Sequence, residues 1–259
     1  MNFLSNILKN IYSVTKRYVR PNGYIATKKY KIVKFCFLKF SFRQAIVLGK
    51  NNKVLLFDEN NKEYLDVTGS KDILHYINVV IEGDNNTVIL PKDYISTFNK
   101  SSITIYGSNN KVDIGSGCKF DGLNICMSYI RDIHQSNRKV LIGKNCTSTR
   151  KLYIRCCGEG VGVTIGEDCM FATNVVLSTT DWHPVCSLAT NERLNPDEDI
   201  VIGDHVWVCD DVKIMKGVSV PDGCVVGIGS LVNKKFAEKN CIIAGIPAKQ
   251  RKSDIKWSR

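Results

Sequence analysis

His183 is the residue of this sequence whose type and setting best suit catalysis. It lies in the segment Ser178-Thr-Thr-Asp-Trp-His-Pro-Val, which interrupts an otherwise regular pattern. An imidazole near neutrality can take a proton from an attacking hydroxyl or amine, so His183 could act as a general base. Asp181 could hold the ring in the required tautomer. The segment alone also fits a loop histidine that makes one backbone hydrogen bond.

The other aromatic and histidine candidates are weaker. Trp207 follows His183 by 24 residues, in Gly203-Asp-His-Val-Trp-Val. His205 in the same segment is expected at the surface, because its position in a regular repeat faces outward. His75 and His134 lie in irregular stretches without a supporting motif.

The elements that must position these residues follow a six-residue period. Each block has an aliphatic first residue, often glycine second, and a small or β-branched fifth. In a helix, apolar residues would recur three and four positions apart. Antiparallel strands would need turn residues between them, which are not spaced that way here. Short strands with a corner every six residues instead predict a parallel β-solenoid. The blocks begin at Ile114, Ile142, Ile165, Ile202, Val208, Ile214, Val220 and Val226.

A looser repeat precedes these blocks. Gly-x-Asn-Asn recurs at residues 49–52, 83–86 and 107–110. Glycine and asparagine tolerate positive φ, so each motif is a credible corner. We expect a basic lead-in segment over residues 1–44, irregular coils over 45–162 and regular coils over 163–259. A separate N-terminal domain is the alternative.

The eleven cysteines are interpreted as structural. Cys118, Cys146, Cys169 and Cys224 each follow the aliphatic first residue of a block by four positions. An odd count and the absence of a CxxC motif argue against a disulfide framework and a zinc site. We therefore expect small buried apolar side chains and no metal.

These repeats resemble the hexapeptide-repeat acyltransferases, whose fold is a left-handed parallel β-helix. The resemblance is strongest over residues 163–250, above all in Val220–Lys249. Bacterial polysaccharide O-acetyltransferases of the sialic-acid type are similar in carrying a histidine loop followed by Gly-Asp-x-Val-Trp. The resemblance implies an all-β protein, an inserted active-site loop, acetyl-CoA as cosubstrate and a homotrimer.

The resemblance also implies roles for individual residues. His183 would be the base, and Trp207 would position the thioester. Asn174, Asp181 and Trp182 are expected to contact the acceptor. Positions expected to bind acetyl-CoA, besides Trp207, are Cys209, Gly227, Ile228, Asn233, Lys234 and Lys249. Cys209 stands where glycine or serine is usual, and Ile246 where asparagine is usual.

Charge is concentrated near the N-terminus. Residues 1–57 hold twelve of the 36 basic residues and no acid. Asn2–Arg20 is predicted as a basic amphipathic helix that meets an anionic membrane, an acidic glycan or its own trimer; nucleic acid is not favoured. With no apolar run of 18 residues and no signal-peptide pattern, we expect a cytoplasmic protein, peripheral at the inner membrane face.

The function predicted from the sequence is acetylation of a hydroxyl on a bacterial surface or capsular polysaccharide, with sialic acid as a candidate sugar. Two alternatives remain at this point. One is N-acetylation of a nucleotide-linked amino sugar. The other is a non-enzymatic β-solenoid scaffold.

Overall fold

The computed structural model describes residues 11–19, 25–33, 45–68, 77–93, 95–128 and 135–259. The chain divides into two compact units, Met1–Phe42 and Arg43–Arg259. The smaller unit contains one antiparallel hairpin of β1 (Ile11–Val19) and β2 (Ile25–Val33), in which Ile11 pairs with Val33.

The helix predicted over Asn2–Arg20 is wrong over Ile11–Val19, which form strand β1. Its remaining residues lie outside the described part of the chain. The segment Ile-Tyr-Ser-Val-Thr-Lys-Arg-Tyr-Val is rich in β-branched and aromatic residues, and these favour an extended backbone. That preference outweighs the loose helical spacing of the apolar residues.

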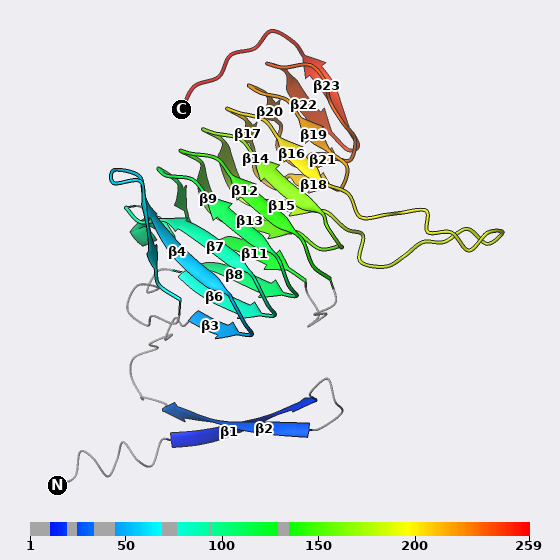
Figure 1. The fold of residues 1–259 in the computed structure, drawn as a ribbon. Helices are drawn as coiled ribbons and strands as arrows, with labels where there is room; N and C mark the ends of the chain where they lie inside the picture. The colour runs from blue at the N-terminus through cyan, green and yellow to red at the C-terminus, as the bar shows by residue number, and fades with distance from the viewer. Residues whose placement is uncertain (1–10, 20–24, 34–44, 69–76, 94, 129–134) are drawn as a thin grey trace. The chain divides into compact units, whose positions relative to one another are not determined.

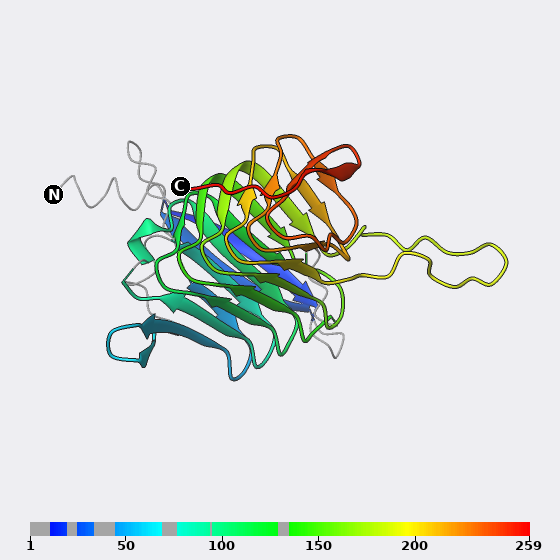
Figure 2. The same ribbon diagram turned by 90° about the horizontal axis from the view of Figure 1, so that it is seen from above.

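The larger unit is a solenoid whose coils stack in register (Figures 1 and 2). Each regular coil has three straight legs. Leg 1 belongs to an eight-stranded sheet. The order of its strands is β19 (Ser219–Val220), β16 (Ile200–Ile202), β14 (Gly162–Ile165), β12 (Lys139–Ile142), β9 (Lys111–Ile114), β7 (Thr87–Pro91), β4 (Lys53–Asp58) and β5 (Glu63–Asp66).

Legs 2 and 3 share a 13-stranded sheet, because β13 (Thr147–Arg155) and β15 (Met170–Ser178) bend through the corner between them. Leg 2 continues in β10 (Lys119–Phe120), β17 (Trp207–Val208), β20 (Val225–Val226) and β22 (Ile242–Gly245). Leg 3 continues in β3 (Ala45–Leu48), β6 (Ile77–Glu82), β8 (Ser101–Tyr106), β11 (Leu123–Met127), β18 (Lys213–Met215) and β21 (Leu231–Val232). A 3₁₀ turn, Ile95–Thr97, precedes β8, and β23 (Ala248–Lys252) pairs antiparallel with β22.

The six-residue repeat sets the register of leg 1. The first residues of the blocks on leg 1 pair directly from coil to coil, in the order Ile114, Ile142, Ile165, Ile202 and Val220. All five side chains are buried. Stacking them one strand spacing apart builds the core from identical contacts, which is why the solenoid prediction is confirmed.

The cysteine positions in the repeat form a second buried column at the corner between legs 1 and 2. The Cys118, Cys146 and Cys169 thiols donate to the carbonyl oxygens of Gly143, Gly166 and Gly203 in the next coil, at 3.2, 3.1 and 3.1 Å. These three cysteines and Cys224 have no exposed surface, and all ten cysteines in the described residues are free thiols. Their predicted role as small apolar residues of the core is confirmed.

The Gly-x-Asn-Asn motifs form the expected corners. Asn51, Asn85 and Asn109 have φ near +56° (55°, 57° and 57°). A Cβ on Gly83 would lie 2.0 Å from the Gly107 carbonyl oxygen, so only glycine fits there.

The second asparagines of these motifs make a buried ladder of side-chain amides. Asn86 Nδ2 donates to Asn52 Oδ1 at 3.0 Å, and Asn110 Nδ2 donates to Asn86 Oδ1 at 2.9 Å. The next coil has Arg138 in this place, and its Nε donates to Asn110 Oδ1 at 3.0 Å. Arg138 is fully buried, and burial lowers the pKa of its guanidinium. The ladder therefore ends in a buried cation held by neutral acceptors.

A search of the described residues finds no helix with the length and apolar character needed to cross a membrane.

Candidate active site

An arm leaves the solenoid between β15 and β16, at the corner between legs 3 and 1. It comprises residues 179–199 and is the long yellow-green excursion in Figure 1. The outgoing and returning segments of the arm pair at an antiparallel bridge between Cys186 and Arg193. Val185, Leu188 and Leu194 expose apolar side chains on the arm. An exposed apolar arm is typical of a segment that packs on another surface.

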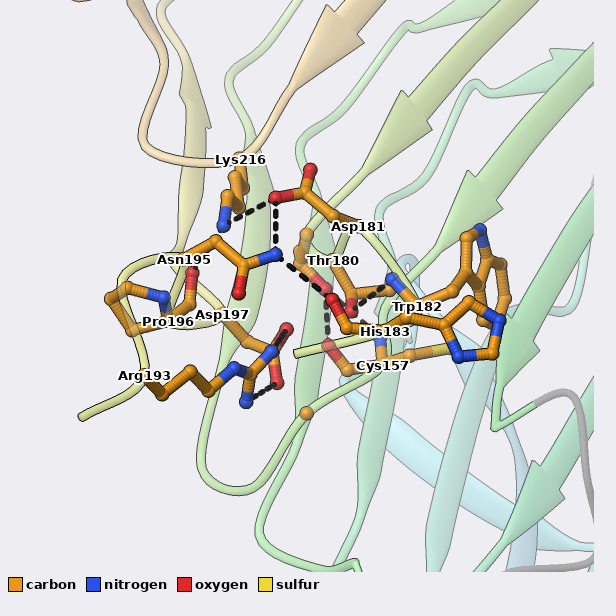
Figure 3. A network of polar contacts seen from close by, with 12 residues as sticks. Cys157, Thr180, Asp181, Trp182, His183, Arg193, Asn195, Pro196, Asp197 and Lys216 are labelled. Carbon is orange, nitrogen blue, oxygen red and sulfur yellow. Dashed lines mark hydrogen bonds and ion pairs between the residues drawn. The ribbon is translucent and has the colours of Figure 1, made fainter. Parts of the chain in front are cut away.

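Polar contacts fix the base of the arm (Figure 3). Lys216 Nζ donates to the Pro196 carbonyl oxygen and pairs with Asp181 Oδ2, each at 2.7 Å. Asn195 Nδ2 lies 3.1 Å from Asp181 Oδ2 and 3.0 Å from the His183 carbonyl oxygen. The hydrogen bond from Lys216 holds the pKa of the Asp181 carboxyl below its ordinary value. The outgoing and returning segments of the arm are thereby held on the coil that carries Lys216.

His183 combines a fixed backbone with a free ring. Its N–H donates to the Asp181 carbonyl oxygen at 2.9 Å, and its own carbonyl accepts from Asn195. The imidazole lies beside the Trp182 indole and points away from the Asp181 carboxylate (Figure 3). Within the described residues the ring nitrogens have no hydrogen-bond partner, so both can meet a substrate. Asp181 acts on the His183 backbone through Asn195 and does not contact the imidazole ring.

Four of the predicted site residues lie at the corner between legs 2 and 3. Asn174 has φ +62°, and its side-chain Nδ2 donates to Asp211 Oδ1 at 2.7 Å. One coil further, Cys209 N–H donates to the Val226 carbonyl oxygen. Gly227 follows in the next coil, where an added Cβ would lie 2.9 Å from the Ala244 Cβ. Ile228 beside it is 71% exposed. The corner therefore combines an exposed apolar side chain, Ile228, with the hydrogen bond between Asn174 and Asp211.

The basic residues predicted for acetyl-CoA occupy the C-terminal end of the solenoid. Lys249 is exposed on β23, opposite Ala244 in the antiparallel pair. Asn233 and Lys234 are exposed after β21, and Lys234 Nζ lies 5.3 Å from the Phe236 ring centroid. The structure places Lys249 near the corner between legs 2 and 3, whereas Lys234 follows leg 3 toward leg 1.

Trp207 lies on leg 2, in register between Met170 and Val225. Its side chain is half-buried on the outer face of the sheet. In a three-sided coil, leg 2 is opposite the corner between legs 3 and 1, which carries His183. One chain therefore does not bring His183 and Trp207 together. A site that uses both residues needs two chains.

The described residues contain no group of three or more histidine, cysteine, aspartate or glutamate side chains arranged to hold a metal ion.

Comparison with curated proteins decides the family. A polysialic acid O-acetyltransferase of Neisseria meningitidis is 35% identical over 192 residues, which are 69% of this chain and 88% of that protein. The chain belongs to the polysialic acid O-acetyltransferase family. It is an acetyltransferase, as the sequence predicts. A scan against protein-family models finds no match.

Solved structures of the family share this fold. The polySia-specific acetyltransferase NeuO aligns with 83% of this chain and 88% of its own, at a TM-score of 0.66 and 31% identity. The polysialic acid O-acetyltransferase OatWY aligns with 83% of this chain and 91% of its own, at a TM-score of 0.65 and 28% identity. The predicted all-β fold with a left-handed parallel β-helix is confirmed.

The sequence did not reveal several residues that surround the predicted site. Lys216 and Asn195 fix the arm, and neither belongs to a recognisable motif. The C-terminal Trp257 lies beside Trp207, with ring centroids 6.0 Å apart. His205 was expected to be an unremarkable surface residue, but it stacks on Trp257 with centroids 4.0 Å apart. A tryptophan in a polar C-terminal tail was the available signal in the sequence.

Proposed function

We propose that this acetyltransferase transfers an acetyl group from acetyl-CoA to a hydroxyl of a surface or capsular polysaccharide, with sialic acid as the acetylated sugar. The alignment over 88% of the Neisseria polysialic acid O-acetyltransferase carries this proposal. The placement of His183 supports it, because a fixed backbone at the base of the arm presents an imidazole that has no hydrogen-bond partner among the described residues.

The corner between legs 2 and 3 fits acetyl-CoA. Gly227 lets this corner pack closely on the next coil, because an added Cβ would lie 2.9 Å from the Ala244 Cβ. Ile228 and Ile246 expose 71% and 75% of their surface. Apolar side chains and open backbone groups suit a long pantetheine arm. Lys234 and Lys249 are positioned as point charges for phosphates at the C-terminal end. Acetyl-CoA supplies the acetyl thioester to this site.

His183 accepts the proton of the sugar hydroxyl as the oxygen bonds to the thioester carbonyl carbon. It then returns the proton to sulfur as the carbon–sulfur bond breaks. Trp207 covers the thioester end and limits its orientation. Asn174 and Trp182 contact the acceptor, and Asp181 keeps the arm, and so the imidazole, in place.

A homotrimer completes this arrangement. His183 and Trp207 lie on opposite sides of one coil, so each active site takes His183 from one chain and Trp207 from its neighbour. The exposed apolar arm side chains, Val185, Leu188 and Leu194, would be covered in the same interface. Closed cyclic association satisfies every such contact without leaving open ends.

An acidic acceptor fits the charge distribution. Twelve basic residues without an acid in residues 1–57 create a positive field that attracts polyanions. The same field would keep the enzyme beside an anionic membrane surface on the cytoplasmic side, where the polymer is made.

The test is thiol release from acetyl-CoA with polysialic acid, a neutral galactoside and a nucleotide-linked amino sugar as acceptors. We expect turnover with polysialic acid and an ester product that mild base removes. The KM for the polymer should rise severalfold between about 50 and 200 mM salt, while kcat stays constant. An alkali-stable amide product would support N-acetylation instead. Absence of thiol release with every acceptor would favour the scaffold.

A further inference from the structure

The C-terminal segment, residues 253–259, returns along the corner between legs 1 and 2, as the red trace in Figures 1 and 2 shows. Ile255 N–H donates to the Asn240 carbonyl oxygen at 2.9 Å. The Trp257 carbonyl oxygen lies 3.2 Å from His205 Nε2. Arg259 reaches the Asn145 carbonyl oxygen at 3.1 Å. The segment therefore runs from the coil of Asn240, past that of His205, to that of Asn145.

Trp257 is inserted into this corner. Only 8% of its surface is exposed. Its indole stacks on the His205 imidazole with an interplanar angle of 10°, and its Nε1–H donates to the His205 carbonyl oxygen at 3.0 Å. Ring stacking and this hydrogen bond fix both the position and the plane of the indole.

Asp168 and Arg259 hold the stacked His205 and Trp257 in place. Asp168 Oδ2 lies 2.6 Å from His205 Nδ1, and Asp168 Oδ1 accepts from Arg259 Nε at 2.8 Å. The guanidinium also donates to Thr147 Oγ1 at 2.7 Å and to the Cys169 carbonyl oxygen at 3.0 Å. A guanidinium with several acceptors is a rigid anchor. We call Asp168, His205, Trp257 and Arg259 the C-terminal clasp.

The clasp ends beside Trp207. The two indoles are tilted by 46° with centroids 6.0 Å apart. Trp207 lies on a strand of two residues, between the smaller side chains of Met170 and Val225. These neighbours flank Trp207 along the sheet, and Trp257 lies beside its indole.

We propose that Trp257 is a positioning residue for acetyl transfer: it holds the Trp207 indole in one orientation, and the other clasp residues hold Trp257. This inference rests on the proposed function, in which Trp207 meets the thioester. Loss of the clasp should then raise the KM for acetyl-CoA and leave the KM for the acceptor unchanged, because the acceptor hydroxyl is bound at His183.

Two substitutions of Trp257 separate positioning from folding. Trp257→Phe keeps a ring against His205 and Trp207, and Trp257→Leu removes it. We expect the KM for acetyl-CoA to rise about fivefold or more in Trp257→Leu and by less than about twofold in Trp257→Phe. The KM for the acceptor should change little in either. Asp168→Asn and Arg259→Gln should raise the KM for acetyl-CoA in the same direction as Trp257→Leu, but by less. The matched control is Lys256→Gln, at an exposed position in the same segment.

A spectroscopic measurement tests the same point without turnover. The chain has three tryptophans, so Trp182→Phe leaves only Trp207 and Trp257. We expect a near-ultraviolet circular dichroism signal from this pair that changes on adding CoA. Asp168→Asn should weaken the signal, and Trp257→Leu should abolish it.

The outcomes are distinguishable. A lower melting temperature in Trp257→Leu, with an unchanged KM for acetyl-CoA and an unchanged CoA response, would overturn the inference and leave a structural role. Absence of thiol release by the unmodified chain would contradict the proposed function. The CoA response of the tryptophan pair would then decide the inference alone.

Discussion

Lys216 Nζ lies 2.7 Å from Asp181 Oδ2 and 2.7 Å from the Pro196 carbonyl oxygen, so one ammonium group joins the outgoing and returning segments of the arm. The Lys216 side chain is only 13% exposed. Because Lys216 follows β18 in the next coil, the rigid solenoid fixes the place from which the arm starts and to which it returns. The backbone of His183 is positioned by this contact.

Lys216→Met should therefore reduce catalysis through the position of His183. We expect kcat to fall about tenfold, because small displacements of a general base are costly, with little change in the KM for acetyl-CoA. Steady-state kinetics with both substrates varied measure this. Lys213→Met, at an exposed position of the preceding strand β18, is the control. Equal kinetics in the two variants would argue against an anchoring role.

Removing the imidazole should have a larger effect. His183→Ala should lower kcat by about 10² to 10⁴, the usual contribution of a general base, while CoA binds as before. Stopped assays of thiol release and calorimetric titration with CoA measure the two quantities. Turnover near that of the unmodified chain would remove His183 from the mechanism.

Complementation tests the active site shared between chains. Light scattering should give three times the 29.1 kDa chain mass. His183→Ala and Trp207→Phe chains should each be poorly active alone. Mixed trimers formed in equal amounts should recover about a quarter of the sites, because a site is intact only when the right chain supplies each residue. Mixtures as inactive as their components would place both residues in one chain or outside the site.

Thiol reactivity should follow the position of each cysteine in the fold. Cys186 is exposed on the arm, whereas burial raises the pKa of the Cys156 thiol to about 12. The reaction of folded protein with a thiol reagent should have a fast phase. In Cys186→Ser this phase should be smaller by one thiol equivalent per chain. Cys156→Ser should leave the fast phase unchanged. A fast phase of equal size in Cys186→Ser would show that the Cys186 thiol is not accessible to the reagent.

The end of the asparagine ladder should be critical for stability. Arg138 donates to the carbonyl oxygens of Tyr106 and Gln135 and to Asn110 Oδ1. Arg138→Met removes the side-chain donor of the two carbonyls and leaves Asn110 Oδ1 only the backbone N–H of residue 138, so the free energy of unfolding should fall by about 3 kcal/mol. Chemical denaturation measures it, with Arg150→Met at an exposed corner as the control. Similar losses in both variants would contradict the buried network.

The strand register and burial of the repeating residues could be predicted from the sequence. Contacts between residues far apart in the sequence could not. Ile142 and Cys146 repeat locally, so their strand register and burial follow from spacing alone. Arg259 and Thr147 are 112 residues apart and meet only because the tail returns along the coils. The opposite placement of His183 and Trp207 likewise depends on which leg each occupies. Local pattern determines the coil, whereas long-range contacts determine the site.

The antiparallel strands at the two ends of the solenoid have a consequence for self-association. The eight-stranded sheet ends in β5 at the N-terminal end, and the 13-stranded sheet ends in β23 at the C-terminal end. Each runs against the direction of its sheet and is four or five residues long. At each end, therefore, one of the two sheets presents a reversed edge, and a second molecule stacked end to end could not continue the parallel pairing of that sheet. The chain's own topology thereby limits end-to-end growth by coil addition.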